Sequence, residues 1–309
     1  MRLAVLLVAL IAGTAWLDTT PVHLTRDCAA SALAPWLGRP PQGHAHNDYL
    51  HPHPLTSALK HGFTSVEADV WPVDGRLLVA HQRDQVDPSR TLESLYLQPL
   101  ARDLHDATSP VPAHLQLLVD VKGSPGSTLP LLRAELASYA GMLTSYRGCT
   151  VVPGRVSVVV SGNAHPLAPR SGGTSLFGYD QPLERGSHPS VEEAVTPLVS
   201  GDWAQWFTWE GRGDMPAREH DRLVRLVEAA HAAGSAIRFW DTPDDPGPAR
   251  DALWRELTED GVDWLSTDDL AGYAAFLRQS QPAPSRPGQE RAGRSRSRTR
   301  SAPRRLRPP

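Results

Sequence analysis

The sequence is poor in the residues that mark several common protein classes. Its 309 residues include two cysteines, Cys28 and Cys149, and they form neither a Cys-x-x-Cys motif nor a Cys/His zinc spacing. It has no Gly-x-Gly-x-x-Gly or Walker loop, which argues against a nucleotide-binding open sheet. Hydrophobic residues make up 40% of the chain and charged residues 21%, which is ordinary globular composition. This composition excludes a multi-span membrane protein, a wholly disordered chain and a collagen.

The first residues carry a short apolar run. Residues 3–17 are uncharged and follow Met1 and Arg2, with small residues near the end of the run. The run is short for a membrane span, so it predicts a secretory signal peptide over residues 1–20, with a retained membrane anchor as the alternative. Export suits the two cysteines, which could pair in an oxidising compartment. We therefore expect a secreted, extracellular protein.

The charge is unevenly divided along the chain. Residues 281–309 contain nine arginines and one acid and so carry a net charge of +8. Because the whole chain has a net charge of -3, residues 1–280 carry -11. A Pro/Ser/Arg-rich segment of this kind cannot form a core, and we predict a disordered basic tail. Such a tail could make transient contact with an anionic surface. It has no aromatic residues and no nucleic-acid-binding motif, so specific nucleic-acid binding is not expected.

The body alternates short apolar runs with amphipathic stretches. The run at 217–233 is the clearest helix, because Leu223, Leu226, Val227 and Ala230 recur at helical spacing before Gly234. Other helices are expected at 55–61, 91–100, 129–140 and 249–260. The expected strands are residues 43–46, 64–70, 76–81, 115–121, 155–161, 174–179, 236–240 and 262–267.

Eight strands alternating with helices favour one parallel (β/α)8 barrel, a TIM barrel, over an open doubly wound sheet. We expect this barrel over residues 40–278, and we expect 186–212, rich in Trp, Gly and Pro, to be a long loop or lid. Catalytic groups of such barrels lie at the carboxyl ends of the strands. The chemistry is therefore sought where the predicted strands end.

Acidic residues occupy two of these strand ends. Glu67 and Asp69 are two residues apart on the second predicted strand and so share a face, and Asp120 lies at the end of the fourth predicted strand. Buried like charges need compensation, which a divalent cation would supply, and three carboxylates suit Mg²⁺ or Ca²⁺. The alternative is that these are rim charges paired with Arg or Lys.

Two histidines flank the acidic strand. His46 and His81 end the predicted strands on either side of it, and a pair of imidazoles can divide general-base and general-acid work. Lys122 could place a positive charge near a phosphoryl oxygen, or form a salt bridge to Asp120 or Asp69. Trp240, at the end of a later strand, could line the pocket or fill the barrel.

These motifs, in this order, resemble those of the phosphodiesterase superfamily of glycerophosphodiester phosphodiesterases, phosphatidylinositol-specific phospholipase C (PLC) and spider sphingomyelinase D. His46-Asn47-Asp48-Tyr49, Ser161-Gly162-Asn163, Arg238-Phe239-Trp240 and Ser266-Thr267-Asp268-Asp269-Leu270 are closer still to the altered inheritance of mitochondria protein 6 family. The resemblance covers residues 41–275.

The resemblance implies a PLC-like barrel and a phosphoric diester hydrolase that acts on glycerophosphodiesters or phospholipid headgroups. It implies a metal held by Glu67, Asp69 and Asp120, an acid–base pair of His46 and His81, and phosphate binding by Lys122. Glycerophosphodiesterases have His-Arg-Gly where this chain has His46-Asn47-Asp48, so the phosphate-gripping arginine is replaced by Asn47, a neutral donor.

Two other functions remain open at this point. One is a non-catalytic barrel that binds a phosphorylated headgroup or a glycan. The other is a glycosidase with two catalytic carboxylates, which is disfavoured because Glu67 and Asp69 lie on one strand and neither histidine would have a task. We predict the enzyme, with a phosphodiester substrate that is either a lipid or a soluble diester, and with His81 as the acid of the pair.

Overall fold

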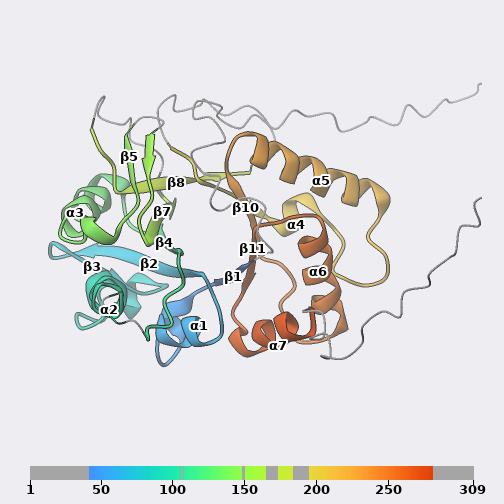
Figure 1. Ribbon diagram of the computed structural model, residues 1–309, viewed down its shortest axis with the longest axis horizontal. Coiled ribbons are helices and arrows are strands. Elements are labelled where there is room, and N and C mark those ends of the chain that lie inside the picture. The colour runs from blue at the N-terminus through green and yellow to red at the C-terminus, as the bar shows by residue number, and fades with distance from the viewer. Residues whose placement is uncertain are drawn as a thin grey trace, which may run out of the picture.

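The computed structural model describes residues 42–104, 106, 108–147, 150–164, 173–183 and 195–280 (Figure 1). The predicted signal peptide, both cysteines, the basic tail and residues 186–194 of the predicted lid lie outside these residues. Among the described helices, none combines the length and the apolar character needed to cross a membrane.

Eight parallel strands close into a barrel, which confirms the predicted fold class. β1 pairs with β2 on one side and with β11 on the other, so the sheet has no open edge between its first and last strands. The barrel strands are β1 (Gln42–Ala45), β2 (Ser65–Val73), β4 (Leu115–Val121), β7 (Val156–Gly162), β8 (Phe177–Pro182), β9 (Leu198–Asp202), β10 (Ala236–Trp240) and β11 (Trp264–Thr267).

The prediction was wrong about one barrel strand. Residues 76–81 do not form a barrel strand: β3 (Arg76–Val79) runs antiparallel to the end of β2 as the second arm of a hairpin. Asp74 and Gly75 both have positive φ, as a tight two-residue hairpin turn requires. The eighth barrel strand is β9, which lies inside the segment that we predicted to be a loop or lid.

Helices pack around the barrel, with α1 to α3 on one side and α4 to α7 on the other (Figure 1). The four apolar residues that predicted helix 217–233 are the buried residues of α5, and Gly234, with φ of 79°, follows its end. The described helices are α1 (Thr56–Lys60), a π-helix (Glu93–Leu97) that runs into α2 (Gln98–Asp103), α3 (Pro125–Ala137), α4 (Trp203–Trp206), α5 (Ala217–Ala232), α6 (Pro248–Glu259) and α7 (Leu270–Ser280).

Short elements complete the described chain. A small hairpin of β5 (Ser145–Arg147) and β6 (Thr150–Val152) precedes β7. Single 3₁₀ turns lie at Asp48–Leu50, Arg83–Gln85 and Ala140–Met142.

The alternation of side chains along the strands separates two environments. On β2, Val66, Ala68 and Val70 belong to the main apolar core, whereas Glu67 and Asp69 face the other way, into the barrel. A second, smaller apolar cluster forms a separate layer, and its members are Leu118, Val159, Leu198, Ala236 and Trp264. The interior is therefore apolar in part, with carboxylates above it at the carboxyl ends of the strands.

Candidate active site

The three predicted carboxylates meet at the carboxyl end of the barrel. Asp69 on β2 is in register with Asp120 on the neighbouring strand β4, and Glu67 precedes Asp69 on the same face. Each of the three offers an oxygen, and these oxygens all lie within 4.8 Å of one another. The period of two along β2 and the parallel register with β4 are what bring them together.

Asp69 is the most crowded of the three. Its side chain is fully buried, and its Oδ2 lies 2.8 Å from the Tyr49 hydroxyl, 3.0 Å from Lys122 Nζ and 3.0 Å from His81 Nδ1. Its other oxygen, Oδ1, is buried without a hydrogen-bond partner. Burial and the Glu67 carboxylate raise the pKa of Asp69, and Lys122 opposes that rise.

Glu67 is compensated from inside the barrel. Its Oε2 lies 3.0 Å from His44 Nε2 and 3.6 Å from Nη1 of Arg238. Burial acts to raise the pKa of Glu67, but the hydrogen bond from His44 and the charge of Arg238 outweigh it and hold the pKa well below the usual range. Burial, followed by the Arg238 charge, lowers the pKa of His44 to about 4, so its imidazole is neutral at pH 7.

Two cations therefore accompany the carboxylates, so the alternative of pairing with Arg or Lys is present in part. Lys122 Nζ lies 3.0 Å from Asp69 and 3.1 Å from Asp120, so the salt bridge that we considered as its alternative role is present. The donor set still fits a hard divalent cation: three carboxylates converge, and Asp69 Oδ1 has no other partner. Glu67, Asp69 and Asp120 are the residues that would hold it.

Each predicted catalytic histidine has one ring nitrogen engaged by a carboxylate. His46, just past β1, has its Nδ1 2.9 Å from Asp268 Oδ1. Partial burial acts to lower the pKa of His46, but the Asp268 hydrogen bond and the Glu67 charge raise it overall. His81 follows the β3 hairpin, which returns it to the end of β2, where its Nδ1 faces Asp69. Because Nδ1 is engaged by a carboxylate in both rings, Nε2 is the nitrogen that would meet substrate. In His46 this atom also lies 3.3 Å from Asn47 Nδ2.

The remaining residues of the first-strand motif are occupied locally. The Asn47 side chain contacts the His46 ring, with Nδ2 3.0 Å from Nδ1, and its Oδ1 lies 2.8 Å from the Tyr49 hydroxyl. Asp48 is buried and accepts hydrogen bonds from the Leu55 amide at 2.6 Å and the Tyr96 hydroxyl at 2.9 Å. Asn47 thus orients the His46 ring, and the hydrogen bonds of Asp48 hold the loop that follows β1 in place.

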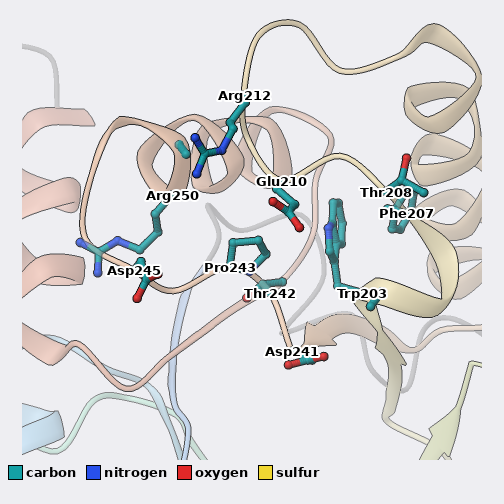
Figure 2. A pocket seen from close by; sticks show the side chains of 12 residues that line it. Trp203, Phe207, Thr208, Glu210, Arg212, Asp241, Thr242, Pro243, Asp245 and Arg250 are labelled. Carbon is teal, nitrogen blue, oxygen red and sulfur yellow. The ribbon is translucent and has the colours of Figure 1, made fainter.

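Trp240 ends β10 at the same end of the barrel, and 41% of it is exposed. Beside it is a cavity of about 410 Å³ formed by the segments that follow β9 and β10. Figure 2 shows Trp203, Glu210 and Asp241 around this cavity, with Arg212 above them in the view. None of the predicted site residues lines this cavity, so it is a neighbour of the carboxylate site and not part of it.

Sequence reasoning missed four contributors, which are Tyr49, His44, Arg238 and Asp268. Asp268 and Arg238 stand in the family-like motifs, but neither had been given a task. His44 lies two residues before His46 on the same strand face, and that spacing was the available signal. Arg238 is a charged residue inside an apolar strand run, and a buried charge of this kind predicts a buried partner of opposite charge.

The barrel, the carboxylate cluster and the two carboxylate-bound imidazoles define a protein of the phosphodiesterase class, and comparison with known families agrees. Residues 39–113 match the model of the AIM6-like phosphodiesterase domain. The chain is 30% identical over 271 residues to altered inheritance of mitochondria protein 6 of Eremothecium gossypii, covering 75% of this chain and 68% of that one. The chain belongs to the altered inheritance of mitochondria protein 6 family.

A second relative and two solved structures have lower identity to this chain. The homologous protein of Arthroderma benhamiae is 26% identical over 262 residues, covering 76% of this chain and 83% of that one. A Ca²⁺-dependent phosphatidylinositol-specific phospholipase C from Streptomyces antibioticus aligns with 13% identity and a TM-score of 0.49 over 77% of this chain and 95% of that one. A glycerophosphodiester phosphodiesterase from Agrobacterium tumefaciens aligns with 18% identity and a TM-score of 0.41 over 76% and 97%.

Proposed function

We propose that this chain is a metal-dependent phosphoric diester hydrolase that uses one divalent cation, Mg²⁺ or Ca²⁺, and a pair of histidines. The observation that carries the proposal is the arrangement at Asp69: its Oδ1 is buried and unpartnered within three converging carboxylates, and its Oδ2 faces His81. When bound, the cation would neutralise charge on the phosphoryl group and polarise a phosphoryl oxygen.

His46 is suited to the role of general base. Its Nδ1–H can donate to Asp268, which leaves Nε2 to take the proton of the attacking oxygen, and the Asp268 carboxylate stabilises the imidazolium that results. The attacking oxygen belongs either to water, giving an open product, or to a neighbouring substrate hydroxyl, giving a cyclic phosphate. In both cases one P–O bond forms as another breaks.

His81 is suited to the role of general acid, because its Nδ1 is held by Asp69 and its ring is about half exposed. It would give its Nε2 proton to the leaving alkoxide. Lys122, whose side chain is partly exposed, would add a fixed positive charge beside the phosphoryl oxygens. We assign Asn47 to the orientation of His46, since its amide already contacts that ring.

We propose lipid-headgroup diesters among the substrates. Leu50 and Trp240 are two of the most exposed large hydrophobic residues among those described, at 65% and 41%. Leu50 lies after β1 and Trp240 ends β10, at the end of the barrel where the site lies. Such residues suit contact with the apolar part of an amphiphilic substrate.

Export, proposed from residues 1–20, is tested separately by N-terminal sequencing of the chain recovered from the medium of a secreting host.

A phosphodiester panel, run with and without a chelator and followed by phosphorus NMR, tests the proposal. It should contain glycerophosphodiesters, a phosphatidylinositol and a sphingomyelin, so that open and cyclic products are distinguished. We expect turnover that chelation removes and that Mg²⁺ or Ca²⁺ restores. Full activity after exhaustive chelation would contradict the metal assignment, and binding of diesters without any cleavage would favour the non-catalytic binding protein.

A further inference from the structure

Arg238 is a buried arginine below the carboxylate site. It is only 4% exposed, and it reaches from β10 to residues on four other strands. Its Nη1 lies 2.6 Å from His44 Nε2, and its Nε lies 3.0 Å from the Ser200 hydroxyl. Because Glu67 on β2 is also a partner and β2 is not a neighbour of β10 in the sheet, the guanidinium must lie inside the barrel.

Two buried carboxylates balance this cation. Nη1 of Arg238 lies 3.6 Å from Glu67 Oε2, and Nη2 lies 3.7 Å from Asp180 Oδ2. All three side chains are at least nine-tenths buried. A buried charge requires a partner in a medium of low dielectric constant, so the position of each of these groups depends on the other two.

The contacts to Glu67 are confined to one of its oxygens. His44 and Arg238 both approach Oε2, which leaves Oε1 as the oxygen available to a cation shared with Asp69 and Asp120. The arginine charge is permanent, and its Nη1 lies 3.6 Å from a carboxylate that a divalent cation would share.

We propose that Arg238 is the resident counter-cation of the carboxylate site: it holds Glu67 in place when no metal is bound, and its charge weakens the binding of a divalent cation. The inference rests on the proposed function, in which Glu67, Asp69 and Asp120 hold the metal. Arg238 is thus a positioning residue, which acts through Glu67 and does not touch substrate. In a purely structural role, its loss would leave metal affinity unchanged or lower.

Calorimetric titration of the full chain with Ca²⁺ and with Mg²⁺, without substrate, tests this role. Arg238→Met removes the charge and should lower the metal Kd about tenfold or more, while it destabilises the metal-free protein. Arg238→Lys keeps the charge and should leave the Kd near that of the parent.

Arg250→Met is the matched control. Arg250, in α6, is also a buried arginine, 5% exposed, and its Nη1 lies 2.8 Å from Asp269 Oδ2. Its loss should lower stability without tightening metal binding. An E67Q/D69N chain measures the background from other groups such as His220, Glu256 and Asp260, which form a second possible cation cluster.

The outcomes separate this role from the proposed function. If the parent binds metal and R238M binds it with the same or a higher Kd, the role of Arg238 is overturned and the proposed metal site remains. No binding above background in either chain overturns both. If R238M does not fold without metal, R238M/D180N removes the cation together with its second anion. This chain should then bind metal more tightly than D180N alone, and equal or weaker binding overturns the role.

Discussion

Replacing Asp268 by asparagine tests whether His46 is the general base. Asp268 Oδ1 lies 2.9 Å from His46 Nδ1, and this contact raises the pKa of His46 against the lowering effect of burial. A base must be neutral to accept a proton, so activity rises as the pH passes the pKa of His46. Asp268→Asn lowers that pKa, and the acid limb of the kcat/KM profile should therefore move to lower pH.

The size of the effect follows from exposure. The side chains of His46 and Asp268 are 37% and 60% exposed, so water and salt screen their ion pair. Exposed pairs contribute at most about 1 kcal/mol, which corresponds to a loss of about fivefold in kcat/KM on the plateau. His46→Ala removes the proton acceptor itself and should cost about 10²- to 10⁴-fold.

The assay is kcat/KM from pH 5 to pH 9 on one soluble diester for the parent, D268N and H46A, at fixed ionic strength. Asp245→Asn, an exposed carboxylate that lines the neighbouring cavity, is the control and should match the parent. The reasoning is refuted if D268N moves the acid limb to higher pH, or if D268N leaves both the limb and the plateau where they were.

Two further changes test the interior and the tail. Burial raises the pKa of Asp180 from 3.8 to about 6, so its ionisation destabilises the fold progressively as the pH rises from about 4 to 6. Asp180→Asn removes this pH dependence as well as a partner of Arg238, so the free energy of unfolding of the variant relative to the parent should rise by up to about 3 kcal/mol between pH 4 and pH 7. The same difference at both pH values would contradict this. Removing residues 281–309 should leave turnover of a soluble diester unchanged and reduce binding to anionic vesicles at low salt, and a loss of cooperative thermal unfolding would show that the boundary is misplaced.

The barrel could be predicted because its strand runs are apolar and regularly interrupted by helices, but two strands illustrate the limit. β9 consists of Leu198–Asp202, a run of only two apolar residues beside Trp- and Gly-rich sequence, and it is recognised only through its pairing with β8 and β10. For β3, the dipeptide Asp74-Gly75 was an available hairpin signal. The apolar run that follows it was assigned to the barrel instead.

For the site, the period of two along β2 and the strand ends were enough to bring Glu67, Asp69 and Asp120 together. The partners of these carboxylates were not predictable in the same way. The contact of Arg238 with Glu67 joins residues 171 positions apart across the barrel interior, and the contact of His46 with Asp268 joins residues 222 positions apart. Such pairings depend on barrel closure and register, which local sequence patterns do not specify.

The central claim is that His46 and His81 transfer protons on opposite sides of the scissile P–O bond. The most direct test compares H46A and H81A on two diesters that differ only in the acidity of the leaving alcohol. A good leaving group needs little general acid, so it should restore most of the kcat lost in H81A and little of that lost in H46A, while both variants stay folded and bind metal like the parent. Equal rescue of both variants, or variants that cleave both diesters as fast as the parent, would contradict the account.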